Sequence, residues 1–366
     1  MTKDDVLCEV RGEVGFITLN RPQALNALSL HMIRALTTCL LAWREDARIQ
    51  AVALRGNDKA GPFGVFCAGG DIRFFHQALL SGDPAAEDFF TEEYSLDHLI
   101  HCFPKPLIAF MDGVVMGGGM GLSQGASHRL VTARSKLAMP ETAIGLFPDV
   151  GGGYFLSRCP GYAGEWLALT GTSLGAAEAI ASGLADHCLD AERLPQAWEA
   201  LAGISPLEAD QMAAWLAEFS MAGEQQPGWD RSRMDAFFSL DSVSAIVRAL
   251  EADPSDWTQR TAVQLRQRSP LMLHVAFEQI RRGRHLTYAQ DLQMERDMMR
   301  HCFFPRHLAR RGAQTEAAEG IRALVIDKDK APLWQPARIE DVSPELVQPF
   351  FDSPWPLHGH PLRALI

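Results

Sequence analysis

The chain has 366 residues, enough for about two domains of ordinary size. Hydrophobic residues make up 47% and charged residues 22%, which argues against a disordered chain, a collagen-like fibre and a coiled-coil rod. Basic residues total 34 against 45 acidic ones, and a net charge of -11 gives no general attraction for nucleic acid or for an anionic membrane surface.

Several further classes are disfavoured by the sequence. It has no apolar run of about 18 residues, and its first five residues lack the features of a signal peptide, so we expect a cytoplasmic location. The seven cysteines are scattered and never form a C-x-x-C pair, which predicts reduced, mostly buried thiols and no zinc site. His98 and His101 have a spacing that can bind metal, but no third ligand accompanies them, so we predict no metal site.

The first predicted elements alternate between strands and helices. Short strands over 6–10 and 14–19 flank a glycine-containing turn and predict a hairpin. Ser29 is placed to cap a helix whose apolar residues recur at helical spacing as far as Trp43. The apolar run 51–54 is typical of a buried parallel strand.

The alternation continues to about residue 160. Within it the sequence predicts helices over 72–80 and 86–102 and strands over 106–111, 129–132 and 136–139. One last helix is predicted much later in the chain, over 316–327. Strands that alternate with helices indicate an α/β fold with right-handed crossovers. Beyond residue 160 the pattern is mainly helical, and we place a domain boundary near 205, which gives domains 1–205 and 206–366.

Two glycine-rich segments suggest a ligand site, because clustered glycines let the backbone turn sharply or approach a ligand closely. In segment 66–72, Asp71 is placed to cap the next helix, which leaves the amides of Gly69 and Gly70 available. In segment 116–123, glycines follow a strand and open a helix, where amides suit an oxyanion. Neither segment fits a P-loop or a dinucleotide motif, and tight turns without a function are the alternative.

A third segment, 139–154, holds two carboxylates in an otherwise apolar loop rich in glycine and proline. Glu141 and Asp149 lie eight residues apart, in a setting where burial can adjust acidity for acid–base or nucleophilic work. The alternative is that they only cap helices or bind local amides. Two amide clusters with two carboxylates would suit a reaction that passes through an enolate or a tetrahedral oxyanion.

Together these segments resemble the enoyl-CoA hydratase/isomerase (crotonase) superfamily, and residues 92–156 closely resemble its 3-hydroxyisobutyryl-CoA hydrolase branch. The resemblance extends from residues 19–28 to 319–329, although 205–260 contain no matching motif. It implies that domain 1–205 is a crotonase-like spiral of repeated ββα turns, which forms the acyl-CoA-binding catalytic core. It also implies that the C-terminal α-helical region over 206–366 covers the site.

The resemblance assigns roles to the glycine segments by position. The amides of Gly70 and Gly118 would form an oxyanion hole for a thioester carbonyl, and Gly69 and Asp71 would lie beside the substrate. The resemblance implies an acyl-CoA substrate. Coenzyme A is then part of the substrate, and no separate cofactor is expected. Homo-oligomers are common in the superfamily, so a homo-oligomer is possible.

The resemblance also assigns the carboxylates. Glu141 and Asp149 match the catalytic and substrate-binding carboxylates of the branch, with Glu141 acting as nucleophile or as general base. Glu93 matches a substrate-contacting glutamate, with a solvated helix face beside Glu92 as the alternative. The basic cluster 281–284 would either meet the phosphates of CoA or form a solvated helix end.

One departure from the superfamily favours hydrolysis over hydration. Hydratases carry a second catalytic glutamate at the position of Gly121, whereas this chain has Asp149 where hydratases have a glycine. The resemblance therefore implies hydrolysis of a short 3-hydroxyacyl-CoA, with 3-hydroxyisobutyryl-CoA in valine catabolism as the expected case. The alternatives are an enoyl-CoA hydratase or isomerase that uses Glu141 alone, and a catalytically silent acyl-CoA-binding protein.

Overall fold

The computed structural model describes residues 4–204, 209–221 and 227–366. The chain forms two compact units, each built from three stretches. The first unit comprises 1–70, 96–138 and 173–229, and the second comprises 71–95, 139–172 and 230–366. The boundary predicted near residue 205 lies outside the described residues, and each unit draws on segments from both sides of it.

The first unit contains the strands of the described residues: β1 (Val6–Arg11), β2 (Val14–Leu19), β3 (Ala51–Asp58), β4 (Gly61–Pro62), β5 (Val65–Cys67), β6 (Leu107–Met111), β7 (Val114–Met116), β8 (His128–Thr132), β9 (Lys136–Ala138) and β10 (His187–Leu189). One sheet has the order β1-β2-β3-β6-β8-β10, with β4 paired to β3, and a second has the order β5-β7-β9. The predicted hairpin is confirmed, because β1 and β2 pair antiparallel. The predicted parallel strand is confirmed too, because β3 pairs in parallel with β2 and β6.

Continuous apolar strands explain the core of the first unit. All six residues of β2 and all five of β6 are buried, as expected of parallel strands covered on both faces. Trp198 packs its ring against Phe16 and Phe110, with centroids 4.8 and 5.2 Å apart in edge-on geometry that aromatic pairs favour. These contacts join the sheet to a helix that follows its last strand.

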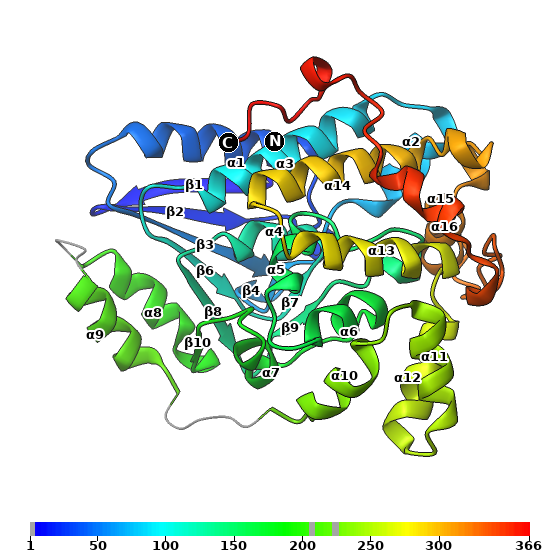
Figure 1. Cartoon of the computed structure of the whole chain (residues 1–366). Coiled ribbons are helices and arrows are strands. Elements are labelled where there is room, and N and C mark those ends of the chain that lie inside the picture. The colour runs from blue at the N-terminus through cyan, green and yellow to red at the C-terminus, as the bar shows by residue number, and fades with distance from the viewer. Residues whose placement is uncertain (1–3, 205–208, 222–226) are drawn as a thin grey trace. The chain divides into compact units, whose positions relative to one another are not determined.

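The helices that lie wholly in the first unit are α1 (Leu30–Glu45), α4 (Gly118–Gln124), α7 (Ala176–Ala181), α8 (Leu194–Leu201) and α9 (Ala209–Phe219). Ser29 caps α1 as predicted, since its side chain accepts a hydrogen bond from the amide of Met32 at 3.3 Å. Helices α8 and α9 lie side by side (Figure 1), and the indole of Trp215 donates to the carbonyl of Ala197 at 3.1 Å.

The second unit is helical in its described residues. Its helices are α2 (Ile72–Ser81), α5 (Gly152–Ser157), α6 (Ala163–Thr170), α10 (Arg231–Phe238), α11 (Val243–Ala252), α12 (Asp256–Arg266), α13 (Pro270–Gly283), α14 (Tyr288–Phe303), α15 (Glu316–Ile321) and α16 (Pro344–Val347). Helix α3 (Ala85–His101) contributes its residues up to 95 to this unit. The predicted helix 316–327 is α15 continued by a π-helical turn over Arg322–Ile326.

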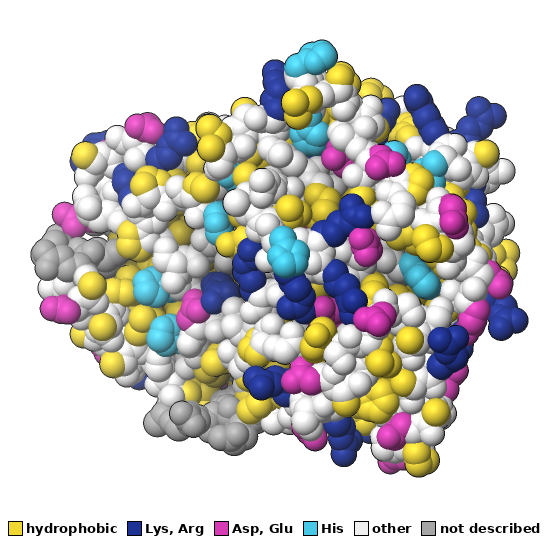
Figure 2. All heavy atoms as spheres, in the orientation of Figure 1, with side chains coloured by type: hydrophobic (Ala, Val, Ile, Leu, Met, Phe, Trp, Pro, Cys, Tyr) yellow, Lys and Arg dark blue, Asp and Glu magenta, His cyan; other side chains and the backbone are white. Residues whose placement is uncertain are grey.

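Surface features add little to the functional argument. Figure 2 shows Lys and Arg side chains interspersed with Asp and Glu on the face that it draws. No helix among the described residues is long and apolar enough to cross a membrane.

All seven cysteines are free thiols, but the expectation that most are buried is wrong, because only Cys67, Cys159 and Cys302 are buried.

Candidate active site

The two predicted amide clusters lie together in the first unit. Strand β5 leads into Gly69 and Gly70, and its parallel neighbour β7 leads into Gly117. The carboxyl ends of parallel strands meet at one edge of a sheet, which brings these glycines together. A Cβ atom added to Gly69 would lie 3.3 Å from the Met116 carbonyl oxygen and 3.6 Å from the Gly118 nitrogen.

Close backbone approach explains why glycine occupies these positions. Gly69 has φ +105°, a region that L side chains rarely adopt, and a Cβ on Gly119 would lie only 2.3 Å from the Cys67 carbonyl oxygen. Gly118 is the first residue of α4, so its amide has no carbonyl one turn earlier to bond. Cys67 is buried and its thiol donates to the Asn26 carbonyl, which indicates a packing role.

Asp71 has the capping role that the sequence predicts. Its side chain accepts a hydrogen bond from the amide of Phe74 at 3.3 Å, at the start of α2. Gly70 forms a parallel bridge with Leu28, and the amide of Leu28 donates to the Gly69 carbonyl at 2.8 Å. These contacts fix the backbone of the first glycine segment, while the substrate contacts of Gly69 and Asp71 stay predictions.

The second unit places Glu141 at the start of a short 3-10 helix, Glu141–Ile144. The helix ends at Gly145, whose φ of +73° directs its amide back to the Glu141 carbonyl. A Cβ on Gly145 would lie 2.1 Å from the Glu316 carbonyl oxygen, so α15 fixes this turn. The Glu141 side chain is only 7% exposed. Burial, and next the charge of Asp149, raise the pKa of Glu141 well above its usual value.

Asp149 precedes a left-handed turn that starts α5. Val150 and Gly151 have φ of +57° and +87°, and the Gly152 amide donates to the Asp149 carbonyl at 2.9 Å. The Tyr94 hydroxyl donates to Asp149 Oδ2 at 2.8 Å. Burial raises the pKa of Asp149 to about 6, although the Tyr94 hydrogen bond opposes that rise by stabilising the carboxylate.

Glu93 completes the acidic set of the second unit. It is 2% exposed on α3, so the alternative of a solvated helix face is wrong. Its charge acts on the neighbouring Tyr94, together with the charge of Asp149, to raise the pKa of the Tyr94 hydroxyl, for which burial is the main cause. The hydroxyl therefore stays protonated and remains a donor to Asp149. A substrate contact of Glu93 stays a prediction.

Three residues of this region were missed by the sequence reasoning. Tyr94 stands next to Glu93 in the matched motif, which is the only local signal for it. Glu295 and Gln279 come from α14 and α13 and bond to the segment around Asp149. They lie more than 130 positions along the chain from their partners, so no spacing rule could have indicated them.

The arginines of the basic cluster 281–284 are half-buried and bonded within the second unit, and a contact with the phosphates of CoA stays a prediction. Arg281 donates to the Leu240 carbonyl at 2.7 Å, and Arg284 pairs with the buried Glu165 at 2.5 Å. Arg282 pairs with Glu278 on its own helix at 2.8 Å. These contacts tie α13 to its neighbours.

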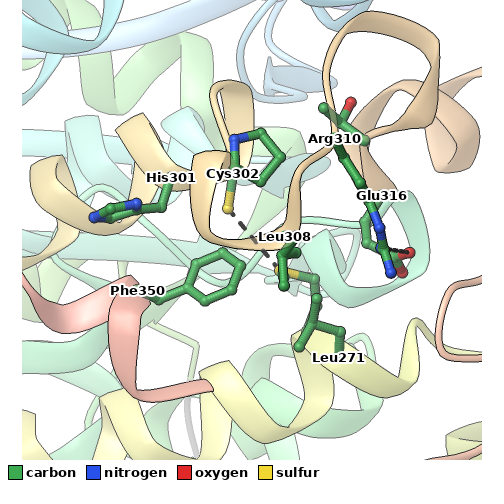
Figure 3. A pocket seen from close by; sticks show the side chains of 11 residues that line it. Leu271, His301, Cys302, Leu308, Arg310, Glu316 and Phe350 are labelled. Carbon is green, nitrogen blue, oxygen red and sulfur yellow. Dashed lines mark hydrogen bonds and ion pairs between the residues drawn. The ribbon is translucent and has the colours of Figure 1, made fainter. Parts of the chain in front are cut away.

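The second unit has two hollows whose linings do not include Glu93, Glu141 or Asp149. Figure 3 shows one lined by Cys302, Phe350, Arg310 and Glu316, with a volume of about 10 Å³, enough for about one water molecule. The other, of about 350 Å³, is an open hollow beside Trp355. Neither is lined by a predicted catalytic residue. Within the described part of the chain, no three His, Cys, Asp or Glu side chains gather as a metal site would require.

Comparison of the chain with known proteins shows the family to which it belongs. A family model described as "Enoyl-CoA hydratase/isomerase" matches residues 14–351. The chain belongs to this family. It is 37% identical to the mitochondrial 3-hydroxyisobutyryl-CoA hydrolase of Gallus gallus, over 95% of this chain and 88% of that protein. It is 36% identical to 3-hydroxyisobutyryl-CoA hydrolase 1 of Arabidopsis thaliana, over 96% of this chain and 92% of that protein. The predicted superfamily and branch are confirmed.

Solved structures of family members confirm the predicted crotonase-like α/β fold. A carnitinyl-CoA dehydratase from Mycobacterium thermoresistibile is similar with a TM-score of 0.85 and 36% identity, over 96% of this chain and 97% of that chain. An enoyl-CoA hydratase from Rhodobacter sphaeroides 2.4.1 is similar with a TM-score of 0.84 and 33% identity, over 96% of this chain and 98% of that chain.

Proposed function

We propose that this family member hydrolyses a short 3-hydroxyacyl-CoA thioester, with 3-hydroxyisobutyryl-CoA as the substrate and 3-hydroxyisobutyrate and CoA as products. The observation that carries the proposal is the buried, electrostatically coupled pair Glu141 and Asp149, with Tyr94 bonded to Asp149. The curated relatives named as 3-hydroxyisobutyryl-CoA hydrolases support the choice of substrate. Valine catabolism is the setting that this substrate implies.

In the proposed reaction the thioester carbonyl oxygen accepts hydrogen bonds from the amides of Gly70 and Gly118. Negative charge develops on this oxygen as the tetrahedral intermediate forms, and preorganised amides stabilise it without reorganising. Removing one such donor typically costs about 2.7 to 4 kcal/mol of transition-state stabilisation. The resemblance of the motifs to the hydrolase branch supports the proposal that these amides and the carboxylates act on one thioester.

Glu141 acts in this proposal as a general base. Its carboxylate removes a proton from a water molecule as the water oxygen bonds to the thioester carbon. The intermediate then collapses, the carbon–sulfur bond breaks, and the CoA thiolate receives the proton that Glu141 holds. Burial and the Asp149 charge raise the pKa of Glu141 and so strengthen its carboxylate as a base.

Asp149 recognises the 3-hydroxyl group in this proposal. The Tyr94 hydroxyl donates to one of its oxygens and favours the ionised form. An ionised carboxylate accepts a further hydrogen bond from the substrate hydroxyl, and a charge-assisted bond of this kind is stronger than a neutral one. The Asp149 carboxylate would therefore give a preference for 3-hydroxyacyl substrates over unsubstituted ones.

Hydration of an enoyl-CoA is the second candidate, because the two solved structures reported above are named as a dehydratase and a hydratase. Gly121 argues against it. This residue lies buried within α4, where the resemblance to hydratases calls for a second catalytic glutamate. Without a side chain there, the hydration mechanism lacks one of its two carboxylates.

One assay separates the two candidates. The purified protein is incubated with 3-hydroxyisobutyryl-CoA, 3-hydroxypropionyl-CoA or crotonyl-CoA, and free thiol and the enoyl chromophore are followed separately. Hydrolysis predicts thiol release from the two 3-hydroxyacyl substrates. Loss of the enoyl signal from crotonyl-CoA without thiol release from any substrate would contradict hydrolysis and support hydration.

Cellular location and assembly stay predictions. The cytoplasmic location expected from the sequence contrasts with several relatives that are named mitochondrial, such as those of Gallus gallus and Rattus norvegicus. Fractionation of cells that express the protein would test the location. Homo-oligomerisation would be tested by light scattering of the purified protein.

A further inference from the structure

The turn that follows Asp149 is held by a buried carboxyl from a distant helix. Glu295 of α14 is fully buried, and its Oε2 accepts a hydrogen bond from the Gly151 amide at 2.7 Å. Its Oε1 accepts one from the Gly153 amide at 2.9 Å. One turn earlier on α14, Asp291 accepts a hydrogen bond from the Tyr154 amide at 2.9 Å. The acids of α14 thus bind three amides, that of Gly151 just before α5 and those of Gly153 and Tyr154 in its first turn.

Helix α13 binds the backbone on the N-terminal side of Asp149. Gln279 is fully buried, and its side-chain nitrogen donates to the Pro148 carbonyl at 2.6 Å and to Glu295 Oε1 at 2.9 Å. Figure 1 shows α13 and α14 as two helices of the C-terminal part of the chain. The backbone is therefore fixed directly before Asp149 and again two and four residues after it.

The fit leaves no slack between the turn and α14. A Cβ on Gly153 would lie 2.3 Å from Asp291 Oδ1, and a Cβ on Gly151 would lie 2.4 Å from the Tyr288 ring. Real Cβ atoms do not approach other atoms so closely, so only glycine at these two positions lets the helix reach the backbone. Shape and hydrogen bonding both make α14 the support of the turn.

We propose that Glu295 is a positioning residue, whose bonds to the Gly151 and Gly153 amides fix the place of the Asp149 carboxyl and so set the selectivity for the 3-hydroxyl group. The inference rests on the function proposed above for Asp149. Glu295 touches the turn and not the substrate. Gln279 completes the arrangement by joining Glu295 to the Pro148 carbonyl.

Electrostatics gives the proposal a second observable. Burial is the main cause that raises the pKa of Glu295 well above its usual value, and the charges of Asp291 and Asp149 add to it. The charged and titratable groups around Glu295 and Asp149 are Asp291, Tyr94, Glu93, Glu141, Cys302 and Arg158. Hydrogen bonds from Tyr94 and from the backbone lower the pKa of Asp149, and a loosened turn weakens them, so the pKa of Asp149 would rise above about 6.

The test compares Glu295→Gln with Glu165→Gln. Glutamine keeps the size of Glu295, but its amide nitrogen cannot accept a hydrogen bond, so at least one bond to the turn is lost. Glu165 is an equally buried acid whose bonded partner is Arg284, and it serves as the control. The readouts are the preference for 3-hydroxyisobutyryl-CoA over isobutyryl-CoA, the acid limb of the pH–rate profile, and hydrogen exchange of peptide 147–156.

Misplacing a catalytic group by about 1 Å can cost about 100-fold in rate. We therefore expect Glu295→Gln to reduce the preference for the 3-hydroxyacyl substrate by about 10- to 100-fold. We also expect the acid limb to move to higher pH and peptide 147–156 to exchange faster. Glu165→Gln should leave all three at their wild-type values, whatever its effect on thermal stability.

The inference would be overturned if folded Glu295→Gln kept the wild-type substrate preference, acid limb and hydrogen exchange. It would also be overturned if Glu165→Gln changed these three readouts by as much as Glu295→Gln does. If Glu295→Gln does not fold, Gln279→Met replaces it, since it removes the bond to the Pro148 carbonyl with little change in volume. The same three changes are expected of it, and their absence would overturn the inference. A wild-type protein without thioesterase activity would instead overturn the proposed function, while hydrogen exchange would still report on the contact.

Discussion

The hydrogen bond from Tyr94 to Asp149 lowers the pKa of that carboxyl, and a single substitution can remove it with little disturbance. Tyr94→Phe deletes only the hydroxyl group, while the ring keeps its place against Phe90, 6.3 Å away between centroids. Both partners are buried, so water does not easily replace the lost donor. Asp149 then loses a contact that favours its charged form, and its pKa must rise.

The size of the effect follows from the strength of the bond. A hydrogen bond to a charged group contributes about 1.5 to 3 kcal/mol, and about 1.36 kcal/mol corresponds to one pH unit. The pKa of Asp149, about 6 in the wild type, should therefore rise by about 1 to 2 pH units, and the acid limb, which reports Asp149 together with Glu141, should move to higher pH. At pH 7 the ionised fraction of Asp149 would fall from about nine-tenths to between one-half and one-tenth, so activity would fall by about 2- to 10-fold.

The assay is thiol release from 3-hydroxyisobutyryl-CoA, with kcat/KM measured between about pH 5 and pH 9. Tyr94→Phe should recover most wild-type activity at the alkaline end, because Asp149 is ionised there in both proteins. Tyr288→Phe is the control, since its hydroxyl contacts the Val150 carbonyl at 3.5 Å and not the carboxylate. An acid limb that stays in place or moves to lower pH in Tyr94→Phe would refute this account of the site.

Three further predictions test other parts of the structure. Gly119→Ala would place its Cβ 2.3 Å from the Cys67 carbonyl oxygen, so we expect it to lower the free energy of unfolding, measured in urea, by about 1 to 3 kcal/mol. Gly203→Ala is the control and should change this free energy little, because its Cβ would lie 3.5 Å from the nearest atom; equal losses in the two variants would contradict the packing argument. Burial raises the pKa of Asp291 to about 7, so the folded state holds a proton that the unfolded state releases, and stability should fall as pH rises from about 4 to 7. Asp291→Asn should flatten this fall in the melting temperature, and an unchanged slope would count against it. In a single turnover in ¹⁸O-water, general-base catalysis places the label in the product acid, and label found in the Glu141 carboxyl would show nucleophilic attack instead.

Local features of the fold could be predicted from the sequence because their causes are local. Ser29 and Asp71 cap the helices they precede, and both the hairpin and the buried parallel strands have the expected pairing. The meeting of the two glycine segments could not be predicted in the same way, because each follows a three-residue strand, β5 or β7, that the sequence pattern does not indicate. The division into two units could not be predicted, since each unit gathers three separate stretches of chain.

The acidic half of the site shows where sequence reasoning ends. Glu141 and Asp149 could be singled out by their apolar surroundings, but their shifted pKa values depend on burial by residues far along the chain. Tyr94 reaches Asp149 across 55 positions, and Glu295 reaches Gly151 across 144. Contacts over such separations leave no periodic or local pattern, so only the folded structure shows them.

The most direct test of the central claim is the rate of thiol release from 3-hydroxyisobutyryl-CoA by the wild type, Glu141→Gln and Asp149→Asn. We predict that the wild type releases thiol and that both variants fold, as judged by circular dichroism. Loss of the general base should lower kcat by about 10²- to 10⁴-fold in Glu141→Gln, and Asp149→Asn should also lose most of its turnover. Wild-type turnover by either variant would remove that carboxylate from the mechanism, and absence of thiol release by the wild type would contradict the proposed hydrolysis.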